Sequence, residues 1–589
     1  MRKDHLSMVG QTACEGRSVS NEQDAANSML RIHFGVPRLI RYLIPFCLGL
    51  LLFLLNNAAP IGALLHPRPG FIPLLLPRTE DSAQYLTWVE ATRTHWTLPD
   101  YHAPWQTEAA LHMPLLWLAG TASNLMQISP VDVYLVVEAS CYVLAIYALV
   151  LLLRVFLWRS EQRILAVALM VCSIPIRSYL LVPALLLKGE GWSLLHCGFM
   201  DLSSEGLFQG ISGAVTETFG TATAILSAAL LGIYFREGKR EQLWIASIVL
   251  ALSGFLHPFE FIPITGAAFI VILLTSRSMR SSIEDLSILC IPALTVVLFY
   301  FEPIQMHPWL KVAADLNRIH FGEVLWSRKD ILHLGWPLYL AFGTAFVGFR
   351  QAARQEKFLA CYVILAVVGY RMPYLPWPQH FIDGLYYGAA ILLVLKFESI
   401  PKLSRLWATS QPWSSCVVVF MVAAALVPHM YFRYLFFRNG SAPTDAYSMN
   451  DRADASVDEL EAITWLRANS TSDRLILAPQ ENAPWMATVP MHSFASHWLF
   501  SLTQFQQKTA SAAFFNGSLS DSASDALLRS YGVSYVLVPR DGPALRYLKK
   551  AKLRWAGRQL ALYEFPDQEM KAVPHLIKDT PYSYVWNLQ

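Results

Sequence analysis

The sequence has few charged residues. Asp, Glu, Lys and Arg make up 15% of its 589 residues, whereas soluble domains carry about 25%. Hydrophobic residues supply 54% and aromatic residues 13%, so the composition predicts a membrane protein. The net charge of +3 is too small to argue for nucleic acid as a partner, and the sequence contains no basic stripe or nucleic-acid motif.

Sequence signals of several other protein classes are also missing. Residues 1–30 are polar, with no signal-peptide hydrophobic region or cleavage site, and residues 1–35 are expected to form a cytoplasmic tail. No cysteine follows Cys416, which excludes a disulfide framework in the C-terminal part. We find no zinc-ligand spacing, nucleophile elbow or glycine-rich phosphate loop. Use of ATP or nucleotide sugars inside the cell is therefore unsupported.

Long apolar runs dominate the chain. At roughly 20 residues per helical span, we predict eleven spans, at 39–59, 131–157, 162–187, 213–235, 242–256, 259–275, 283–301, 332–349, 358–373, 381–396 and 413–433. Lys and Arg gather in the short loops after the even-numbered spans. Because basic loops stay in the cytoplasm, the loops after the odd-numbered spans and the C-terminus are expected to face outward.

The predicted fold is mainly α: a polytopic transmembrane helical bundle of about 11 spans with a small C-terminal α/β domain. The transmembrane domain covers 36–438 and carries three long outer loops, 60–130, 188–212 and 303–331. A polar linker at 439–456 precedes the extracytoplasmic domain, 457–589. Helical periodicity at 457–469, with short apolar runs such as 475–478, indicates alternating helices and strands there.

The acidic pair Glu80-Asp81 closely follows the first apolar run. Aromatic and apolar residues recur at helical spacing from Asp81 to Trp96, which predicts a helix lying at the membrane interface. An acid held at headgroup level could act on lipid-linked substrates. The alternative is a solvated helix start, because acidic residues are common in the first turn of a helix.

Short phrases elsewhere add to this pattern. They are Asp81-Ser-Ala-Gln-Tyr-Leu86, Gln106-Thr-Glu108, His112-Met-Pro114, Glu217-Thr-Phe219, Leu256-His-Pro-Phe259, Ile463-Thr-Trp-Leu466, Ser496-His-Trp498 and Tyr535-Val-Leu-Val538. Together with the order of spans and loops, these phrases resemble the GT-C membrane glycosyltransferases, and in particular a bacterial branch of them. Two departures are that Ser496 replaces a usual Gly, and that a His common after the Glu-Thr-Phe phrase is missing.

The resemblance implies a transferase, inverting in mechanism, that takes a sugar from a polyprenyl-phosphate carrier. The acceptor would be a glycan, lipid or protein of the cell envelope, on the outer face of the bacterial cytoplasmic membrane. Such chemistry needs a base for the acceptor hydroxyl and a group that neutralises the departing phosphate. Asp81 is the candidate base. Glu80 is expected to tune the local field or to contact a metal; the pair could hold Mg²⁺ or Mn²⁺ through oxygen, but the sequence offers no further clustered acids, so a bound metal is not favoured.

Charged side chains near the expected outer cavity are candidates for substrate binding. Glu108 lies in the first outer loop, and Glu217 lies in the first turn of a span, where an acid is costly unless it faces protein or water. Arg177 and Arg371 are candidates for the donor phosphate because guanidinium geometry suits phosphate. Headgroup contact remains an alternative for Glu217, and snorkelling toward the headgroups for Arg371.

Two histidines are further candidates for substrate binding. His257 precedes Pro258 at a break between two apolar runs, where a membrane backbone can open onto a cavity. His380 lies at the outer end of the tenth predicted span. The alternative for His257 is an ordinary packing role.

Two other functions compete with sugar transfer. A transporter or flippase for lipid-linked glycans would be expected to show paired halves with matching broken helices, and no such symmetry is present. An assembly scaffold for envelope polymers would use the C-terminal domain to recruit partners.

Overall fold

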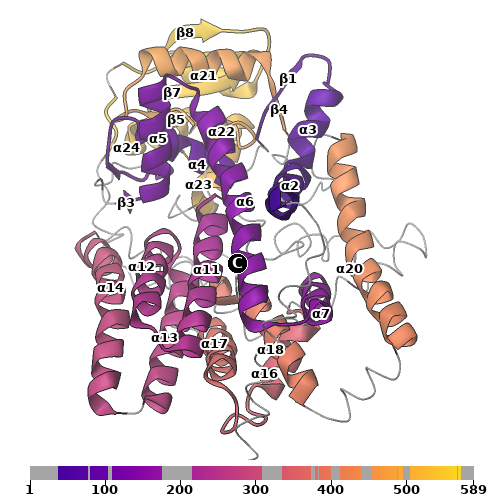
Figure 1. Ribbon diagram of the computed structural model, residues 1–589. Coiled ribbons are helices and arrows are strands. Elements are labelled where there is room, and N and C mark those ends of the chain that lie inside the picture. Colours follow the sequence, from indigo (N-terminus) through magenta and orange to yellow (C-terminus); the bar gives the residue numbers. More distant parts are fainter. Residues whose placement is uncertain are drawn as a thin grey trace, which may run out of the picture.

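The computed structural model describes residues 38–76, 80–103, 111–174, 215–276, 278–307, 334–372, 378–382, 384–399, 411–439, 453–486, 488–494, 504–566 and 568–571, with 109 and 179. Figure 1 shows a bundle of helices in its lower half and a mixed sheet with flanking helices in its upper half. The expected loop 188–212 lies outside the described residues.

Each of the eleven predicted spans contains a helix. These helices are α2 (Arg38–Asn56), α6 (Pro130–Phe156), α7 (Ser160–Val171), α11 (Val215–Glu237), α12 (Arg240–Leu256), α13 (Pro258–Thr275), α14 (Met279–Met306), α16 (Trp336–Thr344), α17 (Arg354–Tyr370), α18 (Leu385–Ser399) and α20 (Gln411–Asn439). The helix α3 (Ala58–Leu65) follows α2 after a bend of 69°, and the short 3-10 helix η2 (Pro378–Ile382) precedes α18.

Fewer of these helices could cross a membrane on length and composition. Among the described residues, four helices are long and apolar enough, namely α6, α11, α13 and α14, or five if the bent pair α2 and α3 is one span. Apolar helices of this length are typical of an integral membrane protein. The count of about eleven spans stays a prediction.

Helix α11 lies at the centre of the bundle and packs against α6, α12, α13 and α17. Small residues allow this close packing, since backbones approach most closely where side chains are short. A Cβ added to Gly220 would lie 2.2 Å from the His257 Cβ, and one added to Gly232 would lie 2.6 Å from the Phe156 ring. The position of His257 therefore depends directly on α11.

Basic residues gather at the opposite end of the bundle from the first turn of α11. Arg240 pairs with Asp285 at 2.8 Å, and Arg354 Nη2 donates to the Thr275 carbonyl oxygen at 2.5 Å. Helix α11 has 23 residues, so at 1.5 Å per residue its two ends lie roughly 35 Å apart. Arginines of separate helices thus lie together at the end of the bundle away from the first turn of α11.

The first loop forms helices that pack against protein. It contains β1 (Phe71–Pro73), α4 (Glu80–Ala91), β2 (Thr97–Leu98), β3 (Leu111–His112) and α5 (Pro114–Met126). The predicted helix ends at Ala91 instead of Trp96. Trp88 and Val89 are buried in one apolar cluster with Leu466 and Trp485 of the C-terminal part. The periodic apolar face of α4 contacts protein, where the sequence predicted a lipid interface.

The C-terminal part is built on a five-stranded sheet with the order β6-β5-β7-β9-β8. Strands β6 (His492–Ser493), β5 (Leu475–Leu477) and β7 (Tyr535–Pro539) are parallel, and β9 (Leu560–Glu564) and β8 (Lys552–Ala556) continue antiparallel. The helices here are α21 (Val457–Asn469), α22 (Ala483–Met486), α23 (Gln504–Phe515), α24 (Asp521–Tyr531) and the 3-10 helix η3 (Pro543–Leu548). The mixed sheet agrees with the expected α/β character.

A strand lies within the stretch expected to be linker. β4 (Asp454–Ser456) pairs antiparallel with β1 of the first loop, with Ile72 opposite Ala455. Arg68 adds an ion pair to Asp454 at 3.3 Å. Through this pairing and the shared apolar cluster, the sheet lies against the first loop (Figure 1).

Candidate functional site

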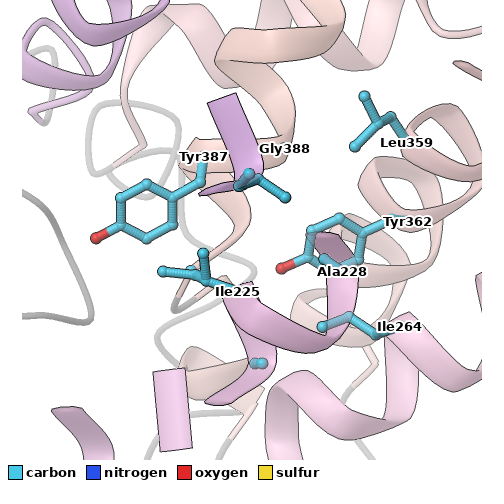
Figure 2. Close-up of a pocket in the computed structure, with 10 residues that line it drawn as sticks. Ile225, Ala228, Ile264, Leu359, Tyr362, Tyr387 and Gly388 are labelled. Atoms are coloured by element: carbon cyan, nitrogen blue, oxygen red, sulfur yellow. The ribbon is translucent and has the colours of Figure 1, made fainter. Parts of the chain in front are cut away.

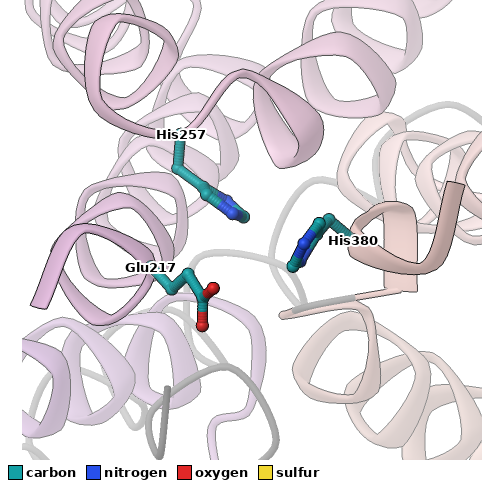
Figure 3. A group of neighbouring side chains, drawn as sticks. All are labelled: Glu217, His257 and His380. Carbon is teal, nitrogen blue, oxygen red and sulfur yellow. The ribbon is translucent and has the colours of Figure 1, made fainter. Parts of the chain in front are cut away.

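Three predicted substrate-binding residues converge at one point. Glu217 comes from the first turn of α11, His257 from the junction between α12 and α13, and His380 from η2. One ligand atom from each lies within 4.8 Å of the others, and Figure 3 shows the three side chains directed toward one another. His257 is buried, and the other two are half-buried. We call these three residues the Glu-His-His cluster.

The local sequence fixes the backbone of His257. Pro258 disfavours a helical conformation in the residue before it, and His257 is extended at φ −152° and ψ 96°. It ends α12, with its N–H donating to the Ser253 carbonyl at 2.7 Å, and it precedes the first residue of α13. Gly220 provides the room on α11 for the His257 Cβ.

The Glu260 carboxyl group contacts the His257 ring at Nδ1. Its Oε2 lies 2.5 Å from His257 Nδ1, and its Oε1 accepts a hydrogen bond from Thr221 Oγ1 at 2.7 Å. Glu260 is fully buried. The sequence analysis did not identify Glu260, although a His followed three residues later by a Glu across a helix start is a signal that could have found it, because residues i and i+3 of a helix are neighbours.

Aromatic contacts hold the His380 ring in place. It stacks on Phe259, with ring centroids 5.0 Å apart and an interplanar angle of 30°, and meets His257 edge-on at 5.1 Å. Both rings of the cluster are thus held by neighbours from the α12–α13 junction.

The helix that carries the acidic pair contacts the same end of α11. Thr216 Oγ1, next to Glu217, donates to the Tyr85 hydroxyl at 3.4 Å. Asp81 precedes Tyr85 by four residues on α4, which is about one helical turn. The contact thus joins α4 to the first turn of α11 about one helical turn from the acidic pair, while the side chains of Glu80 and Asp81 lie outside the described part.

Arg371 is not among the residues of the cluster. Glu108 and Arg177 lie outside the described residues. Arg371 caps the C-terminus of α17, and its guanidinium lies 5.3 Å from the centroid of the Tyr370 ring.

A small apolar cavity lies deeper in the bundle. Ile225, Ala228, Ile264, Tyr362 and Tyr387 are among the residues that line it (Figure 2). Its volume of about 10 Å³ is room for one water at most, so it cannot hold a sugar.

Two buried titratable groups mark the contact between the first loop and the sheet. Burial raises the pKa of Asp100 to about 8, and the His102 N–H that donates to Asp100 at 2.9 Å opposes this shift. Burial lowers the pKa of His492 to about 4, although its Nδ1 lies 2.9 Å from the Ala103 carbonyl oxygen. Both groups therefore favour their neutral forms in the folded protein.

Solved structures of three glycosyltransferases are similar to this chain. The oligosaccharyltransferase of Archaeoglobus fulgidus with a tethered acceptor peptide has a TM-score of 0.45 and 12% identity, covering 85% of this chain and 69% of its own. The arabinofuranosyltransferase AftD from Mycobacteria has a TM-score of 0.48 and 16% identity, covering 89% and 41%. ArnT from Cupriavidus metallidurans, bound to undecaprenyl phosphate, has a TM-score of 0.44 and 8% identity, covering 88% and 97%.

All three are GT-C glycosyltransferases. This is the superfamily that the short sequence phrases resemble. No family model matches the chain, and no curated protein matches it. Because each TM-score is below 0.5 and each identity is at most 16%, the activity of this chain is inferred below from its own residues.

Proposed function

We propose that this protein is a membrane glycosyltransferase that moves a sugar from a polyprenyl-phosphate carrier to an acceptor of the bacterial cell envelope, at the outer face of the cytoplasmic membrane. The observation that carries the proposal is the Tyr85–Thr216 contact. It joins the helix that begins at the acidic pair to the turn that bears Glu217. This contact supports a common site for the candidate base and the candidate ligands at one end of the apolar bundle.

In the proposed reaction, Asp81 acts as the general base. Its carboxylate takes the proton of an acceptor hydroxyl while the hydroxyl oxygen attacks the anomeric carbon of the donor sugar. The bond between that carbon and the phosphate oxygen breaks, and the polyprenyl phosphate leaves with the electron pair. Attack opposite to the leaving group inverts the anomeric configuration. Glu80, Glu108, Arg177 and Arg371 are the further residues proposed for the donor and acceptor.

The charge distribution supports the outer location. Arg240 at the start of α12 and Arg354 at the start of α17 lie at the far end of the bundle, as expected for the cytoplasmic end. The Glu-His-His cluster and the first loop lie at the other end, beside the sheet. A lipid-linked donor could reach this end from the outer leaflet.

The test is turnover by the full chain in lipid nanodiscs. A panel of undecaprenyl-phosphate sugars is supplied with envelope extract as acceptor, and released undecaprenyl phosphate is measured. Because general bases contribute roughly 10²–10⁴-fold, Asp81→Asn should lower release at least about 100-fold.

Asp132→Asn is the matched control. Asp132 is an exposed carboxylate in the first turn of α6, at the same end of the bundle, and its loss should leave release unchanged. Equal turnover by Asp81→Asn and the wild type would remove Asp81 from the mechanism. Absence of release from every donor would remove the proposed function itself.

A further inference from the structure

The Glu-His-His cluster has the composition and spacing of a metal site. Each of its three residues offers one ligand atom, and these atoms lie within 4.8 Å of one another. Two ligand atoms on one tetrahedral Zn²⁺ lie roughly 3.4 Å apart, since each bond measures about 2.0–2.1 Å. Side-chain movements of less than about 1 Å would therefore bring all three atoms onto one ion.

The contact with Glu260 gives independent support. An ionised carboxylate only accepts hydrogen bonds, so in the neutral tautomer that binds metal the 2.5 Å contact with Oε2 assigns the His257 proton to Nδ1. Its Nε2 is then the nitrogen with a lone pair. Metal-bound histidines characteristically donate their other N–H to a carboxylate in this way, which fixes the ring and raises its basicity. The Thr221 hydroxyl in turn orients Glu260.

Charge balance also favours a cation. Glu260 is fully buried and Glu217 is half-buried, and both carboxylates lie among the two imidazoles of the cluster. Buried charges require a compensating partner. A divalent ion held by Glu217 and the two imidazoles would add positive charge beside both carboxylates, and it would bind the imidazoles in their neutral form.

We propose that Glu217, His257 and His380 bind one Zn²⁺ ion, with Glu260 positioning His257. Two imidazole nitrogens and one carboxylate favour a transition metal over Mg²⁺, which prefers oxygen ligands. Three protein ligands leave a fourth position for water or a phosphate oxygen. Zinc binding itself does not depend on the proposed sugar transfer.

The test measures zinc directly in the purified full chain. After chelator treatment and reloading with ZnCl₂, elemental analysis should find about one zinc per chain for the wild type. His380→Ala should lower the zinc affinity at least 100-fold, and the double variant His257→Ala/His380→Ala should bind none. Glu260→Gln keeps all three ligands, and it should weaken affinity roughly 10–100-fold.

His66→Ala is the control, because His66 is exposed and lies outside the cluster; it should bind zinc as the wild type does. Size-exclusion profiles confirm that each variant is folded, and Co²⁺ in place of zinc gives a visible spectrum that should be lost in His380→Ala. Less than one-tenth of a zinc per chain in the wild type, or full retention by the folded double variant, would overturn the proposal. In that case imidazolium–carboxylate pairs would account for the cluster. Since the readout is metal content, failure here is distinguishable from failure of sugar transfer.

Discussion

At the scale of single residues, the structure places acids and histidines in contrasting environments. Glu260 is buried but receives a hydroxyl hydrogen bond and an imidazole contact. Asp100 is buried where the first loop meets the sheet, and its pKa is raised to about 8 by desolvation. The first arrangement suits the positioning of a ligand, while the second predicts that the stability of the loop–sheet contact depends on pH.

Asp100→Asn should remove part of this pH dependence. The folded pKa of about 8 exceeds the ordinary value of 3.8, so the folded state holds the proton more tightly. Stability is therefore full below pH 4 and is lost as the pH rises toward 8, because the unfolded chain gains by ionising. The amide cannot ionise, so the variant should melt a few degrees higher than the wild type at pH 8 and equally at pH 4.

Thermal unfolding of the full chain at the two pH values checks this expectation. The control is Glu461→Gln, which removes an exposed carboxylate on α21. It should leave the melting temperature unchanged at both pH values. A pH profile of Asp100→Asn that parallels the wild type would show that Asp100 titrates normally.

At the scale of elements, the fit between α11 and the α12–α13 junction decides where His257 lies. Ser253 Oγ donates to the Gly220 carbonyl oxygen at 2.9 Å, and the His257 Cβ occupies the space that a Gly220 side chain would take. Such a close approach requires glycine on α11.

Gly220→Ala should destabilise the protein although alanine is the better helix former. Alanine in a helix is ordinarily worth about 0.5–1 kcal/mol over glycine, but the new methyl would lie 2.2 Å from His257 Cβ. Overpacking of this kind costs about 1–3 kcal/mol. The melting temperature should fall, and zinc affinity should fall at least tenfold as His257 is displaced.

Gly343→Ala is the matched helical control. Nothing lies within 4 Å of the added Cβ on α16, so its melting temperature should stay the same or rise slightly. Equal behaviour of the two variants, measured by thermal unfolding and zinc titration, would show that the α11 contact does not position His257.

At the scale of the whole molecule, the first loop joins the bundle to the C-terminal sheet. Its strand β1 pairs with β4, which precedes the sheet. Its residues share an apolar cluster with α21 and α22, and its Tyr85 contacts α11. The Glu-His-His cluster, the start of α4 and the sheet are therefore at one end of the bundle. The basic helix ends are at the other.

Cysteine labelling should place these two ends on opposite sides of the membrane. Glu461→Cys on α21 should react with a membrane-impermeant maleimide in intact spheroplasts. Arg280→Cys in the first turn of α14, whose native side chain is 91% exposed, should react only after lysis. The parent chain, treated identically, reports labelling of native cysteines. Labelling of both positions in intact spheroplasts would contradict the proposed arrangement of spans.

Much of the helical architecture could be predicted from the sequence, because apolar runs must form helices where no water satisfies the backbone. The five-stranded sheet was harder to predict from the sequence. The runs at β5, β7 and β9 are apolar and buried, whereas β8 is largely exposed and β6 has only two residues. Such short or polar strands depend on their neighbours for pairing, and sequence pattern alone does not identify them.

The sequence by itself determined that this is an apolar, helix-rich membrane chain, and it identified Glu217, His257 and His380 one at a time. Only the tertiary structure decided that these three residues meet, that Glu260 contacts one of them, and that Tyr85 of α4 contacts the turn bearing Glu217. The physical reason is distance along the chain: the ligands come from three separate helix ends, and their approach depends on helix packing around Gly220. The burial of Glu260 likewise depends on residues that only the folded chain packs around it.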